Sequence, residues 1–168
     1  MKKAAVVIGL AMACLLVNPS LWSQDKDRAE LAKAVAEAKV SLEQGLSVSA
    51  HEGKPISAKF EIEEGKLQLS VYTAKSDKFS EVVVDHNTAK ATKTEPITGG
   101  EDLAAAKAQS EAMSKAKQSL SVALARTLKG NSGFRAVSIF PALKDGHPMA
   151  EVILTKGDEW KTVSEKLD

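Results

Sequence analysis

Asp85 and His86 are adjacent, and they form the pair of side chains in this sequence best suited to chemistry. A carboxylate beside an imidazole can tune a general base or a metal ligand. The same pair also fits a closing turn, in which Asp85 accepts backbone N–H groups and His86 faces water. We predict the turn, because no second histidine or cysteine lies at metal-ligand spacing from His86.

The remaining candidate ligands are scattered along the chain. His51 is expected at a helix end and His147 in a turn, with Met149 close to the latter. Together with His86 they would form a small-ligand or metal-ion site only if distant segments met.

Three glutamates also lie close together. Glu61 and Glu63 alternate with an apolar residue and are therefore expected on the outer face of a strand. No calcium-loop spacing surrounds them or Glu64. The run 156–159 has the composition of a hairpin turn.

Covalent and cofactor chemistry lack their usual motifs. Cys14 is the single cysteine, and the serines lie outside any Gly-x-Ser-x-Gly elbow. Neither a phosphate loop nor a dinucleotide fingerprint occurs. We therefore predict a protein that is not an enzyme, with no catalytic, cofactor-binding or metal residue and no cofactor.

The first residues resemble an export signal. Lys2 and Lys3 precede an apolar run of 14 residues, 4–17, which is typical of a secretory signal and short for a membrane span. We expect cleavage after Ser23, so that 1–23 is removed and the protein is periplasmic or secreted. Lipoprotein processing at Cys14 is the second alternative, and a retained anchor is the third.

Charge narrows the partner class. Without Lys2 and Lys3 the chain has 21 basic and 22 acidic residues, and the two signs are interspersed. This balance predicts neither nucleic-acid binding nor attraction to an anionic membrane surface. We expect a partner that is another envelope or secreted protein.

The elements that must position these residues occur twice. An offset of 78 aligns identical residues around Ser41 and Ser119, and an offset of 81 continues the match after an insertion at 130–133. The aligned pairs are Ala34 and Ala112, Ala38 and Ala116, Lys39 and Lys117, Leu42 and Leu120, Leu46 and Leu124, Ser57 and Ser138, Gly65 and Gly146, and Phe79 and Trp160. Each aromatic residue of the last pair is predicted to anchor its own core; a paired aromatic surface is the alternative.

Each copy begins with a helical pattern. Apolar residues recur at helical spacing over 25–51 and again over 101–129. Ser41 with Gln44 fits a capping box that would divide the first segment, but the repeat upstream of the serine favours one continuous helix.

Strand patterns follow each helix. Period-two alternation predicts strands at 56–62, 67–73 and 79–85 and at 136–140, 149–155 and 160–164. Pro141 is expected at a strand end or edge, and 89–100 as a linker. The expected fold is α+β, with two tandem repeats that each place a helix on a three- to four-stranded antiparallel sheet. The predicted parts are 1–23, 24–95, a linker at 96–100, and 101–168.

The first copy resembles the PepSY domain. The resemblance is based on the helix start at 41–44, the turn at 64–66, the strand at 69–72 and the closing run 84–90. Ala89 stands where the family has glycine, and the second copy lacks the closing run. The resemblance implies a secreted bacterial protein that inhibits or assists a peptidase. We therefore expect a protein-binding module, with a periplasmic small-ligand or metal-ion sensor as the alternative.

Overall fold

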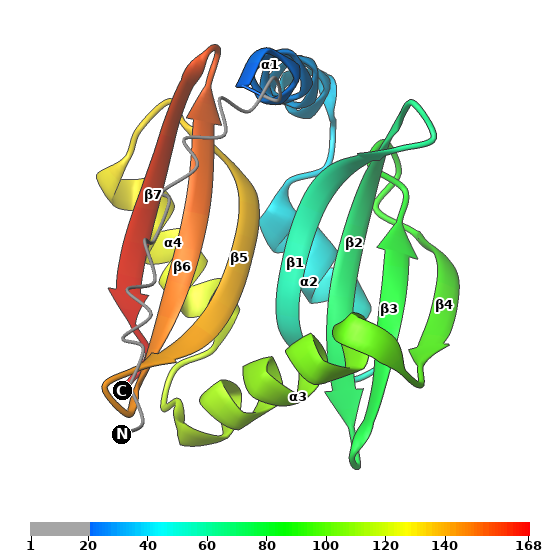
Figure 1. Cartoon of the computed structure of the whole chain (residues 1–168), viewed down its shortest axis with the longest axis vertical. Helices are drawn as coiled ribbons and strands as arrows, with labels where there is room; N and C mark the ends of the chain where they lie inside the picture. The colour runs from blue at the N-terminus through cyan, green and yellow to red at the C-terminus, as the bar shows by residue number, and fades with distance from the viewer. Residues whose placement is uncertain (1–20) are drawn as a thin grey trace, which may run out of the picture.

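The computed structural model describes residues 21–168, which form four helices and one antiparallel sheet (Figure 1). The N-terminal half contains α1 (Leu21–Glu37), α2 (Leu42–Ser49), β1 (Lys54–Glu63), β2 (Lys66–Lys75), β3 (Lys78–Val84) and β4 (Ala91–Ile97). The C-terminal half contains α3 (Gly100–Lys115), α4 (Leu120–Gly130), β5 (Arg135–Lys144), β6 (His147–Lys156) and β7 (Glu159–Lys166). The predicted α+β class is confirmed.

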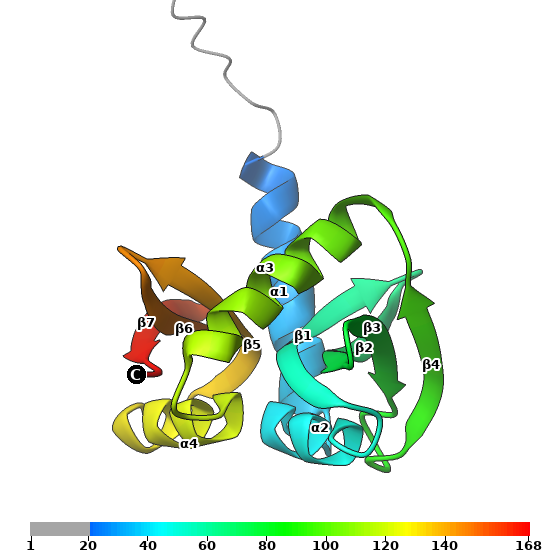
Figure 2. The ribbon, with the colours of Figure 1, turned by 90° about the horizontal axis from the view of Figure 1, so that it is seen from below.

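The two halves share one sheet of seven strands, in the order β4-β3-β2-β1-β5-β6-β7. They join through a short antiparallel pairing of β1 with β5, in which Ala58 is opposite Ile139 and Lys59 is opposite Ser138. Helices α2 and α4 cover one face of the sheet and α3 lies on the other, whereas α1 runs past the strand ends from the side of α3 toward α2 (Figure 2). We call the side of α3 the open face, because α3 crosses only the ends of the strands there.

The expected continuous helix over 25–51 is wrong, since α1 ends at Glu37 and α2 starts at Leu42. Ser41 is the N-cap of α2, and its hydroxyl accepts from the backbone N–H of Gln44. The Gln44 side chain accepts in return from the Ser41 N–H at 2.8 Å, which completes a capping box. The carbonyl of His86 accepts from the N–H groups of Lys39 and Val40, so the tertiary structure stabilises the break.

The single helix expected over 101–129 is wrong for the same reason. Ser119 caps α4 by accepting from the N–H of Val122, and the carbonyl of Leu167 accepts from Lys117 and Gln118. Leu167 aligns with His86 at the offset of 81. Each half therefore divides its helical segment by binding the break to the end of its third strand.

Strand β4 lies in the segment expected to be a linker, 89–100. Six of its seven residues are exposed and Ile97 is half-buried, so no alternating apolar pattern marks it. It pairs along β3, with Thr94 opposite Val82. Backbone hydrogen bonds to an existing strand edge, rather than burial of side chains, make this segment a strand.

Pro141 lies inside β5, so of the two expected places, a strand end or an edge, the strand end is wrong. The two-residue turn between β5 and β6 makes Lys144 and His147 a hydrogen-bonded pair. Hydrogen-bonded and non-hydrogen-bonded pairs alternate from there along β5, so the backbone of Pro141 points away from β6 and toward β1. The pairing of β1 with β5 covers only Ile139 and Ser138 of β5, so no ladder bond is missing at Pro141. Strands β1 and β5 of the two halves are not paired at Pro141, so this proline lies on an edge within the sheet.

The core lies between the sheet and the two covering helices. It contains fully buried aliphatic residues from both halves, among them Leu42, Leu69, Val82, Leu120, Ile139 and Leu154. Helix α2 approaches β2 so closely that a Cβ at Gly45 would lie 2.8 Å from Cδ2 of Leu69. Glycine at position 45 therefore makes room for a large residue at position 69.

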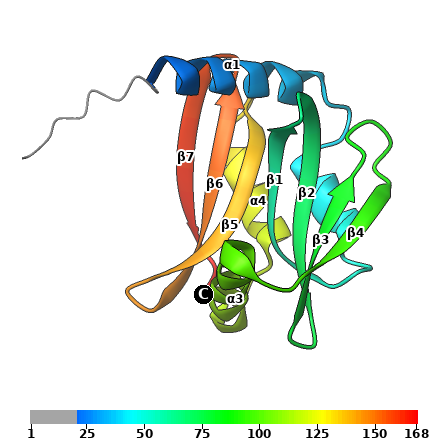
Figure 3. The same cartoon turned by 45° about the vertical axis from the view of Figure 1, so that its right-hand side comes forward.

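Helices α1 and α3 connect the halves. Figure 3 shows α1 lying across the strand ends of both halves, and it contacts β1, β2 and β5. Arg135 of β5 donates to the carbonyls of Ala38 at 3.0 Å and Val40 at 3.4 Å, just after α1. Lys54 of β1 donates to the carbonyl of Met113 in the last turn of α3 at 3.2 Å. A cation from each half thus binds the carboxyl end of a helix in the other half.

Candidate functional site

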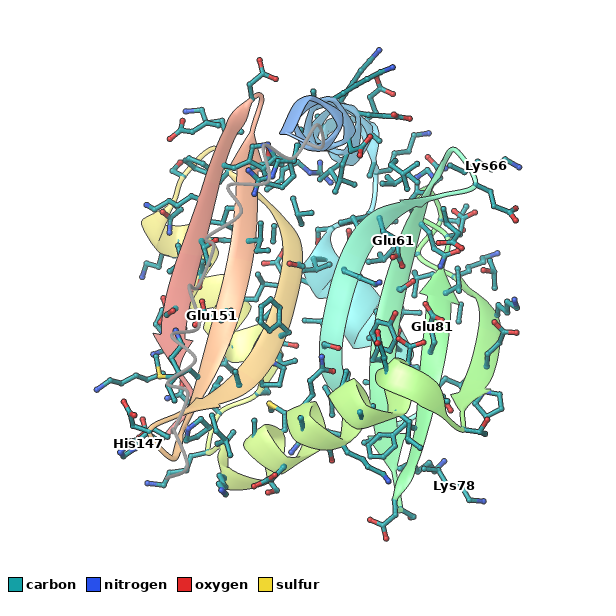
Figure 4. The ribbon with its side chains drawn as sticks, in the orientation of Figure 1. Glu61, Lys66, Lys78, Glu81, His147 and Glu151 are labelled. Carbon is teal, nitrogen blue, oxygen red and sulfur yellow. The ribbon has the colours of Figure 1, made fainter. Side chains whose placement is uncertain are left out.

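Strand alternation makes the open face of the N-terminal half polar. Glu61 of β1 accepts from the hydroxyl of Ser70 at 3.0 Å and pairs with Lys59 at 2.6 Å. Gln68 donates to the same hydroxyl at 3.0 Å. Figure 4 shows Glu61 and Glu81 over the strands of the N-terminal half and Glu151 over those of the C-terminal half, with Lys66, Lys78 and His147 at the hairpins.

Tyr72 lies at the centre of this polar network and is half-buried. Burial raises the pKa of its phenol to about 12, although the nearby Lys59 ammonium acts in the opposite direction. The phenol is therefore neutral at physiological pH and donates to Glu81 at 3.4 Å. Burial alone would lower the pKa of Lys59, but the hydrogen bond to Glu61 and the charges nearby raise it. Lys59 thus remains a cation, 5.7 Å from the centre of the Tyr72 ring.

A groove of about 190 Å³ opens on this face where β1 meets β5 beside α3. Tyr72 and Lys59 line it on one side, and Phe140 of β5 lines it on the other. Phe140 is 37% exposed, one of two large hydrophobic residues exposed in the described chain. Ser57 donates to the Gln109 side chain of α3 at 2.7 Å, which fixes the helix over the groove. The central groove therefore combines an exposed aromatic ring with a phenol and a cation.

The open face of the C-terminal half has its own carboxylate. Glu151 of β6 accepts from Ser164 at 2.5 Å and pairs with Lys144 at 2.5 Å. Burial acts to raise the pKa of Glu151, but the hydrogen bonds from Lys144 and Ser164 outweigh it and lower that pKa. This carboxylate is ionised and paired, which is unsuitable for a general acid.

A second hollow, of about 670 Å³, lies between the end of α1, the β1–β2 turn and the end of β3. Asp85 and His86 line it, together with Glu63 and Glu64. Asp85 accepts from the N–H groups of Asn87 and Thr88, both at 2.8 Å, and these bonds lower its pKa. The predicted role of Asp85 in a closing turn is confirmed.

The expectation that His86 faces water is wrong in part. His86 is half-buried, and its Nδ1 is buried without a hydrogen-bond partner. His86 lines the 670 Å³ hollow, and its carbonyl binds the break between α1 and α2. Sequence reasoning assigned the residue to a turn and could not show that the helix break lies against it.

The other candidate ligands lie apart. His51 is exposed in the turn after α2, and His147 is exposed at the start of β6, with its Nδ1 3.1 Å from Asp168. Met149 is half-buried two residues further along β6. Within residues 21–168, no group of three or more histidine, cysteine, aspartate or glutamate side chains is placed to hold a metal ion. Cys14 and the apolar run 4–17 lie outside the described residues, whereas the expected cleavage point after Ser23 lies within α1.

The aromatic pair identified from the repeat has mainly a packing role. Phe79 is 8% exposed and belongs to the core, as expected. Trp160 is half-buried against the core, and the guanidinium of Arg28 lies 5.3 Å from its ring. Both aromatics follow a two-residue turn, opposite Ala74 and Thr155 respectively.

Sequence reasoning did not identify the groove residues Tyr72, Lys59 and Phe140 as a group. Each of these residues alternates with buried neighbours along its strand, so the sequence pattern places it on the outer face of that strand. This alternation is the feature of the sequence from which the three residues could have been found. Only the pairing of β1 with β5 brings the strands of the two halves together.

Comparison with known proteins identifies no family. No family model matches this chain, and no curated protein matches its sequence. One solved structure, of a candidate lipoprotein from Clostridium difficile 630, aligns with a TM-score of 0.40 at 11% identity, covering 71% of this chain and 79% of that one. Among the described helices, none is both long enough and apolar enough to cross a membrane.

Proposed function

We propose that this chain is a protein-binding module without catalytic activity, and that the central groove is its binding element. The observation that supports this proposal is the exposure of Phe140 beside Tyr72 in a groove of about 190 Å³. Aromatic residues are enriched at protein interfaces relative to the rest of the surface. Lys59, which lines the groove, is paired with the carboxylate of Glu61, and this pairing favours binding over proton transfer.

The partner class follows from the PepSY resemblance. The proposed partner is another envelope or secreted protein, and a peptidase is the class that the resemblance implies. We also propose that the halves are tandem repeats. The equivalent N-caps Ser41 and Ser119, and the equivalent strand bulges at Ile56 and Val137, support this proposal.

A capture experiment tests the groove. Immobilised protein is exposed to envelope extract, and the proteins retained are identified by mass spectrometry. Phe140→Asp should remove a specific retained protein, because it places a charge where the partner would bury apolar area. Val122→Asp is the matched control, since Val122 is the other large exposed hydrophobic residue and lies on α4. Equal retention by both variants would contradict the proposal.

Export is a separate proposal, based on the apolar run 4–17. Intact-mass measurement of protein recovered from the producing cells should show a chain that begins near Gln24 and carries no lipid. A diacylglycerol on Cys14 would show lipoprotein processing instead.

A small-ligand or metal-ion sensor is the second candidate function. The 670 Å³ hollow beside His86 supports it, because its size is within the range of small-molecule pockets and His86 lines it. Calorimetric titration with zinc and with nickel checks the metal version. Heat that disappears in His86→Leu would favour this candidate over protein binding.

A further inference from the structure

Strand β7 forms one edge of the sheet, and within residues 21–168 no strand pairs with its outer side. The equivalent strand of the N-terminal half, β3, has its outer side covered by β4. An uncovered edge presents unpaired N–H and C=O groups that another strand can bind.

The turn before β7 determines which backbone groups face outward. Gly157 and Asp158 form a two-residue turn, so the flanking Lys156 and Glu159 are a hydrogen-bonded pair. Bonded and non-bonded pairs alternate along an antiparallel ladder. The backbones of Trp160, Thr162, Ser164 and Lys166 therefore point away from β6.

We propose that β7 pairs in antiparallel fashion with β7 of a second copy of this chain, with Val163 on the two-fold axis. This register places Thr162 opposite Ser164 of the other copy, and both residues have outward backbones. It also places Lys161 opposite Glu165, and Trp160 opposite Lys166, in both directions across the axis. The interface thus gains two pairs of opposite charge and two contacts between a cation and an aromatic ring.

Other registers lose this complementarity. A shift of the two-fold axis to Thr162 places Glu159 opposite Glu165, and a shift to Lys161 brings two lysines together. Like charges directly opposite each other destabilise a strand pair. Within each copy Lys161 already donates to Asn131 at 2.6 Å, and an ammonium retains further donors for Glu165 of the second copy.

Helix α4 supports the same partner. Glu165 pairs with Arg126 of α4, so this side of the helix faces the β7 edge. Val122 lies one turn before Arg126 on that side and is 51% exposed. A two-fold axis through Val163 brings the α4 helices of both copies to the same side of the joined sheet. Val122 of each copy then lies on the side of α4 that faces the other copy.

The opposite edge is less suited to pairing. Strand β4 contains Pro96, which has no N–H to donate, and its side chains from Ala91 to Pro96 are exposed. The fold thus has one edge with a proline and one edge that complements itself.

Sedimentation equilibrium of the purified protein, from micromolar to millimolar concentration, tests the proposal. The expected result is a monomer–dimer equilibrium in that range. A monomer at every concentration would overturn the proposal, whether the edge is then free or binds a different protein.

Two charge variants test the register. Lys161→Glu places glutamates opposite each other, and Glu165→Lys places lysines opposite each other, so each variant alone should weaken dimerisation at least tenfold. An equimolar mixture should recover a heterodimer, because every 161–165 contact then joins opposite charges. A dimer unaffected by either variant, or a mixture that remains monomeric, would overturn this register.

Two further variants separate this interface from the central groove. Val122→Asp should weaken the dimer, whereas Phe140→Asp should not. Circular dichroism and thermal melting confirm that each variant is folded. If Lys161→Glu no longer dimerises but still captures a partner through the groove, the β7 edge and the central groove are independent surfaces. Each proposal then has its own test, and the failure of one does not decide the other.

Discussion

The two halves of this protein solve the same packing problem with different residues. In the N-terminal half, Gly45 of α2 allows Leu69 of β2 to fill the space beneath the helix. The aligned residues of the C-terminal half are Ala123 of α4 and Ala150 of β6, both fully buried. A glycine on the helix and a leucine on the strand thus correspond to two alanines. The two alanine side chains together contain two carbon atoms and the leucine side chain contains four, so the halves do not keep the combined side-chain volume and pack this position differently.

The halves also differ at their closing contacts. The helix break is bound by the carbonyl of half-buried His86 in one half and by the carbonyl of Leu167, which is fully buried, in the other. The backbone interaction is the same, but the imidazole leaves Nδ1 without a partner. The backbone therefore determines this contact, and the side chain is free to vary.

The largest expected effect comes from exchanging the packing pair. Leu69→Ala should lower the free energy of unfolding by about 2–5 kcal/mol, and Gly45→Ala by about 1–3 kcal/mol through overpacking. The double variant imitates the C-terminal half and should lose less than the sum, because the new methyl group occupies part of the cavity. Urea unfolding of the unmodified protein, the two single variants and the double variant gives the coupling energy between positions 45 and 69. If the losses of unfolding free energy in the two single variants simply add up in the double variant, the side chains at the two positions do not compete for the same space.

The contacts between the halves are the next test. Arg135→Ala should cost about 1.5–3 kcal/mol, because charged hydrogen bonds to two carbonyls are lost. Lys54→Ala should cost less, since Lys54 is exposed and makes one such bond. Urea unfolding again measures both. If the halves then unfold in separate steps, the apparent m-value of Arg135→Ala will also fall. A larger loss in Lys54→Ala would contradict the difference inferred from burial.

His86→Leu gives the N-terminal half the residue of the C-terminal half. It should raise the free energy of unfolding by about 1 kcal/mol, because it removes a buried nitrogen without a partner. The reverse change, Leu167→His, should be destabilising, since Leu167 is fully buried. Thermal melting of both variants provides the measurement. A destabilised His86→Leu would show that the imidazole makes a favourable interaction in its hollow.

The smallest expected effect is at the closing turn after β3. Ala89 has a φ of 55°, which favours glycine, and its N–H donates to the carbonyl of Asp85 at 3.0 Å. Ala89→Gly should stabilise the protein by about 0.5–1 kcal/mol. The matched control is Gly65→Ala, where φ is 75° and no atom would contact the new methyl group. It should be destabilising by a similar amount, and a neutral result for both variants would remove backbone strain as the cause.

Much of the local structure is determined by the sequence itself. Period-two alternation located six of the strands, and residue composition located the hairpin turn at 156–159. Burial of alternate residues is a local consequence of a strand that has one covered face, so it appears in any short window. The proposed repeat predicted which elements of the two halves correspond, and the bonds that Asp85 accepts from the backbone followed from its place in a closing turn.

The tertiary structure alone decided the rest. Strand β4 exists because β3 offers it an edge, and both helix breaks exist because the carbonyls of His86 and Leu167 bind them. The central groove arises where β1 meets β5 and is fixed by α3, so its residues from the two halves come from distant parts of the sequence. Backbone hydrogen bonds between distant segments depend on where the strands lie and hardly on which side chains they have. For that reason the sequence contains the residues of the groove and of the β7 edge without showing their arrangement.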